Sequence, residues 1–165
     1  MIMKNKRPQN FLLAALLTFS LAACGDEHSH GVEDPAAEAC EHLSGPATQV
    51  TAAVSPLGAP MVAADHKRYD VKLLDGVSGG KSGVIGVTIG QKGHLLVFLG
   101  RDVPVAISNA AGTAILGQRA NAAPPCAQLK AAYEYEVTVG RHDITLGGPA
   151  NAIETVGLVL ETESH

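Results

Sequence analysis

The sequence predicts an all-β protein, an antiparallel β-sandwich or jelly roll of about eight strands. Aromatic residues make up only 4% of the 165-residue chain, whereas Gly and Pro number 18 and 9. This mix suits short strands joined by tight turns. Apolar and polar residues alternate along several short segments, and clusters of turn residues separate them. No segment shows a helical pattern longer than two turns, although a short helix is expected near Leu129.

Three of the expected strands have a distinctive pattern. Residues 133–139 alternate, which places Tyr133, Tyr135, Val137 and Val139 on one face. Tyr133 and Tyr135 are therefore expected in the core rather than as a carbohydrate-binding platform. Residues 94–99 are largely apolar, which predicts a strand buried on both faces. The third segment, residues 103–108, contains Pro104, which favours an edge position or a strand start. The full set of expected strands is 47–54, 69–74, 84–89, 94–99, 103–108, 113–116, 133–139, 143–146 and 153–160.

The first residues have the three parts of a secretory leader. Residues 1–10 are basic, 11–19 (FLLAALLTF) are apolar, and the small residues of 21–25 (LAACG) follow. The apolar run is shorter than the roughly 20 residues that a transmembrane helix needs. Residues 1–23 are therefore expected to form a cleaved signal helix.

Leu21-Ala22-Ala23-Cys24 resembles the lipobox of bacterial lipoproteins. The resemblance implies cleavage before Cys24, diacylglycerol on its thiol and a lipid-anchored protein of the cell envelope, facing the periplasm or the cell surface. Several acyl chains together give stable membrane anchoring. Gly25 after the cysteine favours the outer membrane under that family's sorting rule. An ordinary secretory signal with a coincidental cysteine is the alternative.

The remaining chain divides into two parts. Residues 24–39 are acidic, small and without apolar periodicity, which predicts a lipidated flexible tether. Residues 40–165 would form the β-sandwich domain. If Cys24 carries lipid, Cys40 and Cys126 remain, and in an exported protein such a pair is expected to form a disulfide. A loop of roughly 86 residues would then give about 4 kcal/mol of stabilisation. Two unpaired, buried thiols are the alternative.

The sandwich also resembles the pre-peptidase C-terminal domains of secreted bacterial enzymes over residues 69–160. The resemblance rests on Gly93-x-x-x-Val97-Phe98, the segment 103–112, and Val139-Gly140-x-x-Asp143-Ile144-x-Leu146. Asn109 replaces the usual Asp, and His142 stands near the usual Tyr. The resemblance implies a binding or structural module rather than an enzyme.

Charge and motifs argue against several functions. Without the leader's Lys4, Lys6 and Arg7, 9 basic residues face 16 acidic ones, a formal charge of −7. No basic stripe is present, so a nucleic-acid partner is not expected. Residues 76–82 (GVSGGKS) have Asp75 where a phosphate-binding loop needs Gly, so no nucleotide is expected. Gly76-Val77-Ser78-Gly79-Gly80 matches the letters of a Gly-x-Ser-x-Gly pattern, but the segment after it is strand-like. A nucleophile elbow requires a helix there, so none is expected.

The seven histidines suggest a second hypothesis. His28 and His30 follow two acidic residues in the tether, and His42 lies close behind. Neutral imidazoles beside carboxylates suit zinc or copper. The alternative is a solvated tether in which these histidines are incidental. His66, His94 and His142 are expected to be surface or hydrogen-bonded structural residues, with His142 in a hairpin turn.

The leading hypothesis is therefore a non-catalytic envelope lipoprotein. Its sandwich would bind an envelope protein or glycan, or play a structural role, and its lipid would hold it to the membrane. A metal-binding lipoprotein that uses the N-terminal His and acidic residues is the alternative.

Overall fold

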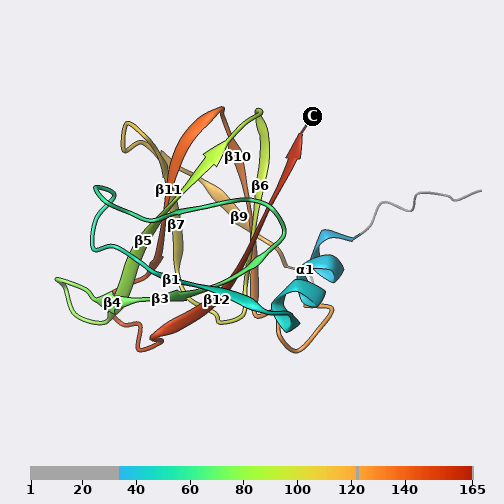
Figure 1. The fold of residues 1–165 in the computed structure, drawn as a ribbon, viewed down its shortest axis with the longest axis horizontal. Coiled ribbons are helices and arrows are strands. Elements are labelled where there is room, and N and C mark those ends of the chain that lie inside the picture. The colour runs from blue at the N-terminus through green and yellow to red at the C-terminus, as the bar shows by residue number, and fades with distance from the viewer. Residues whose placement is uncertain (1–33, 122, 165) are drawn as a thin grey trace, which may run out of the picture. The chain divides into compact units, whose positions relative to one another are not determined.

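A computed structural model describes residues 34–121 and 123–164. The described residues form one helix and twelve strands, which build two facing sheets (Figure 1). The proposed signal peptide, Cys24, His28 and His30 lie outside the described residues. Within the described part of the chain, no helix is long and apolar enough to cross a membrane.

The first sheet carries the helix on its outer face. Its strand order is β1-β3-β12-β6-β10-β9. The bounds of these strands are β1 Ala47–Thr51, β3 Arg68–Lys72, β12 Thr155–Ser164, β6 Gly93–Leu99, β10 Ala131–Val137 and β9 Gly117–Arg119. β1 runs parallel to β3, and the other neighbours are antiparallel.

The second sheet has the order β2-β5-β11-β7-β8, and β4 also pairs with β5. The bounds of these strands are β2 Met61–Val62, β5 Lys81–Ile89, β11 Gly140–Gly147, β7 Val105–Asn109, β8 Ala114–Ile115 and β4 Leu74–Asp75. β2 runs parallel to β5. The predicted all-β sandwich is confirmed, but its sheets are mixed rather than purely antiparallel. The 16 residues between β1 and β3 are long enough for the crossover that a parallel pair requires.

Alternating side chains fill the space between the sheets. On β6, Leu95, Val97 and Leu99 face the central core, whereas Leu96 and Phe98 join the cluster beneath the helix. Both faces of β6 are thus covered, which confirms the expectation that residues 94–99 are buried on both faces; only His94 and Leu96 are half-buried. Tyr135 is also in the core, as predicted, with 3% of its surface exposed.

Three local expectations differ from the structure. The described residues near Leu129 form bends at 125–128 rather than a helix, although Leu129 itself is buried. His142 lies in strand β11 instead of a hairpin turn, because β11 begins at Gly140. Val139 lies beyond the end of β10 and is exposed, so it does not share the buried face of Tyr135.

Helix α1, Pro35–Ser44, corrects the expected boundary of the flexible tether. Asp34 caps the helix by accepting a hydrogen bond from the Ala36 N–H at 3.0 Å, and Pro35 suits the first turn. The ordered domain therefore begins before Cys40, and residues 35–39 belong to it. Tertiary contacts explain the error: the buried Ala39 and Leu43 pack in the cluster beneath the helix.

The predicted disulfide is confirmed. Cys40 on α1 and Cys126 in the loop before β10 are bonded, with Cα atoms 6.0 Å apart. The bond fixes the helix to the outer face of the first sheet, where it contacts Phe98 and Val159. The position of two polar helix residues, Glu38 and His42, is fixed along with it.

Candidate metal centre

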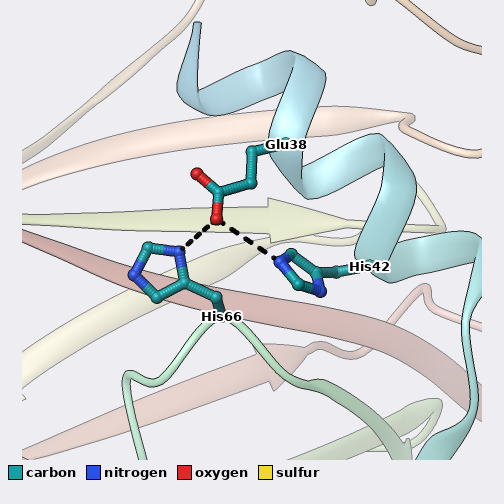
Figure 2. A group of neighbouring side chains, drawn as sticks. All are labelled: Glu38, His42 and His66. Carbon is teal, nitrogen blue, oxygen red and sulfur yellow. Dashed lines mark hydrogen bonds and ion pairs between the residues drawn. The ribbon is translucent and has the colours of Figure 1, made fainter. Parts of the chain in front are cut away.

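One group of described residues has ligand atoms close enough to hold a metal ion. It consists of Glu38, His42 and His66, whose nearest ligand atoms lie within 4.8 Å of one another. Figure 2 shows both imidazole rings directed at the same carboxylate. The three side chains come from two segments that the chain brings together at the edge of α1.

Helix α1 supplies two of the three side chains. Glu38 and His42 are four residues apart, which places them on the same face of the helix, one turn from each other. His42 Nε2 lies 3.5 Å from Glu38 Oε1. Cys40, between them in sequence, is used in the disulfide and is not a ligand.

His66 comes from the loop between β2 and β3 and has an unusual backbone conformation. Its φ is +62°, the only positive φ of a non-glycine residue in the described chain. Such a conformation costs roughly 1–3 kcal/mol and is concentrated at functional sites. Its backbone N–H donates to the Leu160 carbonyl at 3.2 Å, which holds the loop against β12. The imidazole Nδ1 then lies 3.0 Å from Glu38 Oε1.

A second carboxylate lies beneath the cluster. Glu161 on β12 is only 3% exposed, and its Oε1 is 3.5 Å from His66 Nδ1. Burial raises the pKa of Glu161, nearby His66 opposes this effect, and the neighbouring Glu38 carboxylate adds to it. Neither Glu161 Oε1 nor His66 Nδ1 has a hydrogen-bond partner within the described structure. A buried polar atom without a hydrogen bond is costly even beside an opposite charge, and a bound cation would remove that cost.

Two imidazoles and the Glu38 carboxylate form a nitrogen and oxygen ligand set, and the Glu161 carboxylate lies beside one of its members, His66. Such sets suit zinc, copper or nickel, and histidine makes calcium and magnesium poor fits. Ligand atoms at about 2.0–2.1 Å from a tetrahedral zinc ion lie about 3.3 Å from each other. The Glu38–His66, Glu38–His42 and Glu161–His66 separations of 3.0, 3.5 and 3.5 Å bracket that value.

The structure brings together a different set of candidate ligands from the set that the sequence predicts. His42 does join a cluster, whereas His28 and His30 lie outside the described residues. Glu38 and His66 were missed. Glu38 fell in the segment interpreted as tether, and His66 was expected to have only a surface or structural role. The Asp34-Pro35 helix start and the four-residue spacing of Glu38 and His42 were the available signals.

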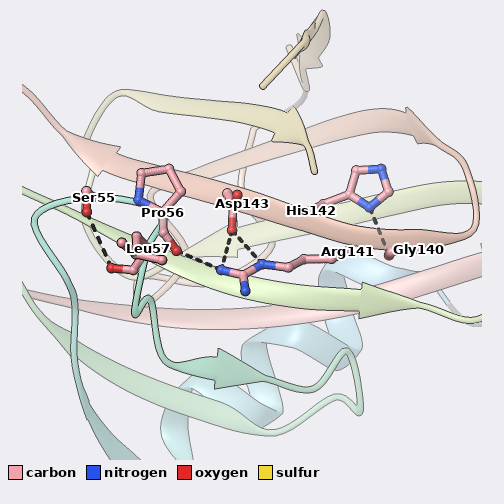
Figure 3. A network of polar contacts seen from close by, with 7 residues as sticks. All are labelled: Ser55, Pro56, Leu57, Gly140, Arg141, His142 and Asp143. Atoms are coloured by element: carbon pink, nitrogen blue, oxygen red, sulfur yellow. Dashed lines mark hydrogen bonds and ion pairs between the residues drawn. The ribbon is translucent and has the colours of Figure 1, made fainter. Parts of the chain in front are cut away.

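The other two internal histidines lie apart from this centre. His94 on β6 contacts the Glu134 carboxylate on the neighbouring strand β10. His142 on β11 is 1% exposed, and its Nδ1 lies 3.2 Å from the Gly140 carbonyl. Figure 3 shows it beside a separate network in which Arg141 binds Asp143 and the Pro56 carbonyl. His66, His94 and His142 therefore do not converge on one site.

The glycine-rich segment that superficially resembles a phosphate-binding loop is a turn, as predicted. It joins β4 to β5, and the Gly76 N–H donates to the Gly80 carbonyl at 2.8 Å. The Lys81 amine lies 2.9 Å from Asp75 and 3.7 Å from Glu154. This lysine is thus already surrounded by carboxylates.

Comparison with protein-family models and with curated proteins finds no match to this chain.

Proposed function

We propose that this protein is a lipid-anchored envelope lipoprotein whose sandwich binds a divalent transition-metal ion, such as zinc or copper. Glu38, His42 and His66 would be the primary ligands, and Glu161 would complete the site from below. One observation carries the proposal: His66 Nδ1 and Glu161 Oε1 are buried without hydrogen-bond partners beside the carboxylate of Glu38. The lipobox-like sequence around Cys24 supports the anchor.

The charges of the site fit a divalent cation. Two carboxylates and two neutral imidazoles carry a formal charge of −2, which one such ion neutralises. Ionised Glu38 and Glu161 would otherwise repel each other across His66. The acidic surface of the domain would also raise the local concentration of cations.

Exposure of the site favours an exchangeable ion. The side chains of His42 and His66 are 37% and 43% exposed, so an ion can enter from solvent. Glu161 is buried on β12 and closes the side of the site that faces away from solvent. We therefore favour reversible binding or delivery of metal by a non-catalytic module, rather than a buried structural ion.

Metal titration by calorimetry tests this proposal. The chain from Gly25 onward, exported behind a cleavable secretory signal so that its disulfide forms, is titrated with zinc and with copper. Saturable one-site binding is expected. His66→Ala and Glu161→Gln should each weaken it by at least about tenfold, since even outer-shell changes have effects of that size. His94→Ala, which alters a histidine outside the cluster, serves as the control.

A deletion distinguishes this centre from the tether histidines. Removing residues 25–33 eliminates His28 and His30 but keeps the Asp34 cap and all of α1. Unchanged affinity supports the centre at His66. Loss of binding on deletion, with full binding in His66→Ala, would assign the metal to the tether, and no binding in any variant would refute the metal function.

The lipid anchor has a separate test. Mass spectrometry of the protein extracted from its native envelope should find an acylated Cys24 as the first residue. An unacylated mature terminus, or an intact leader, would contradict the anchor without affecting the metal measurement.

A further inference from the structure

A second candidate site lies on the outer face of the first sheet, near the end of α1. It is a pocket of about 410 Å³ whose lining includes Arg68, Gly100, Arg101, Lys130 and Gly157. Gly157 is four residues before Glu161 on β12, a separation of about 13 Å along a strand. The pocket is thus separate from the metal centre, and the inference does not depend on a bound metal.

The floor of this pocket contains two adjacent glycines that the fold does not require. The Gly100 N–H donates to the Gly157 carbonyl at 2.8 Å, so the two lie side by side. Neither has a positive φ. A Cβ atom added at Gly157 would meet its nearest neighbour, Leu43 Cδ2, at 3.5 Å, and one at Gly100 would meet its nearest at 3.6 Å. Both distances are ordinary contacts.

A glycine inside a strand weakens that strand and often marks the close approach of a ligand. Gly157 lies within β12, between β3 and β6. Neither the backbone conformation nor the packing at this position requires glycine. The space that a side chain would otherwise occupy therefore points to a ligand. An alanine at the same position would fill part of the pocket.

The rim of the pocket is positive although the domain is acidic. Arg68, Arg101 and Lys130 line it, three of the nine basic residues that follow the proposed leader. The lining has one acidic side chain, Asp70, which already binds Arg68 at 2.9 Å and Gln49 at 3.2 Å. The side chains of Arg101 and Lys130 have no ion pair or hydrogen bond within the described structure. Both residues are exposed, and unpaired cations that line one pocket are a feature of anion sites.

Arg68 is the fixed member of this group. Its Nε donates to Asp70 at 2.9 Å, and its Nη1 donates to the Leu43 carbonyl at 2.6 Å. These bonds hold the guanidinium in place and leave Nη2 without a partner among the described residues. A held guanidinium with a spare donor loses less entropy on binding an oxyanion than a mobile side chain does.

We propose that this pocket binds a small molecule through an oxyanion group, a carboxylate or a phosphate. Arg68 would orient the group, Arg101 and Lys130 would supply charge, and the backbone at Gly157 would allow the ligand to approach the sheet. The pocket volume falls in the range typical of small-molecule sites.

Nuclear magnetic resonance titration of the exported chain tests the proposal, with inorganic phosphate and glutarate as separate probes. Saturable shifts of the Gly100 and Gly157 amides are expected with at least one probe. Shifts with phosphate alone assign a phosphate group, shifts with glutarate alone assign a carboxylate, and shifts with both assign the shared oxyanion chemistry. Absence of saturable shifts with both probes would overturn the proposal.

Three variants separate a binding role from a structural one. Arg101→Gln with Lys130→Gln should weaken binding by at least about tenfold, the effect of losing one charge-assisted contact. Lys92→Gln with Arg119→Gln removes equal charge elsewhere and should leave the affinity unchanged. Gly157→Ala should stay as stable as the parent but bind more weakly. Equal weakening by both charge pairs, or full binding by Gly157→Ala, would overturn the proposal.

Discussion

Removal of the disulfide should lower both the stability of the domain and its affinity for metal. The change is the double substitution Cys40→Ser/Cys126→Ser, which leaves no reactive thiol in the domain. The bond closes a loop with a sequence separation of 86 residues. The chain-entropy relation for a loop of that size gives a loss of about 4.6 kcal/mol in unfolding free energy at 25 °C.

Local effects add to this global one. Helix α1 has only 10 residues, and helices of that length are marginal in water without tertiary contacts. It carries Glu38 and His42, so both ligands depend on how firmly the helix is held. Without the bond to Cys126, the helix keeps only its packing through residues such as Leu43. We therefore expect weaker zinc binding in the same variant.

Urea denaturation followed by circular dichroism measures the first effect. With a urea m-value of about 1.5 kcal/mol/M, a loss of 4.6 kcal/mol shifts the midpoint by about 3 M. Zinc calorimetry on the same samples, below the denaturation range, measures the second. The parent protein treated with reductant is the control and should behave like the double variant.

Two results would refute this reasoning. An unchanged urea midpoint would show that the bond does not restrict the unfolded chain as its loop length implies. Unchanged zinc affinity, with the expected loss of stability, would show that α1 stays docked through packing alone and that the disulfide does not support the metal centre.

Three further changes have defined outcomes. Burial raises the pKa of Tyr135 to about 12, so the folded state keeps the phenol proton to a higher pH than the unfolded state does. The unfolding free energy should therefore fall by up to about 2.7 kcal/mol between pH 10 and 12. Denaturation of Tyr135→Phe as a function of pH should lack that part of the loss. His66→Gly removes the strain of the positive φ and should raise the unfolding free energy of the metal-free protein by about 1 kcal/mol. The same variant should bind zinc more weakly. A lower denaturation midpoint would contradict the strain assigned to His66. Asp34→Ala removes the helix cap and should cost about 1 kcal/mol, with faster amide exchange in the first turn of α1 as the readout; unchanged exchange would exclude a capping role.

Sequence periodicity located the long strands because their side chains alternate between core and surface. Strands such as β2 and β4, with two residues each, are too short for any period to be visible. The parallel pairing of β1 with β3 depends on how a connection crosses the sandwich, which local sequence does not encode. Both sheets were for this reason expected to be purely antiparallel.

The candidate metal centre was predicted only at His42. Two of the proposed ligands are distant from His42 in sequence: His66 lies in a loop, and Glu161 lies on the last strand. Glu38 is close to His42 but lies in a segment whose small and acidic residues favour disorder when considered alone. Tertiary contact with Phe98 and Val159, together with the disulfide, makes that segment helical.

The lengths of the outermost strands affect how neighbouring copies of the protein could associate at high density. Three of the four end strands, β2, β8 and β9, have only two or three residues, and very short end strands discourage a neighbouring chain from adding a strand. At the remaining end, β1 offers five residues. If lipid anchoring packs many copies onto one membrane, chain-to-chain strand addition should begin at β1, and a proline at Gln49 would be the natural place to block it.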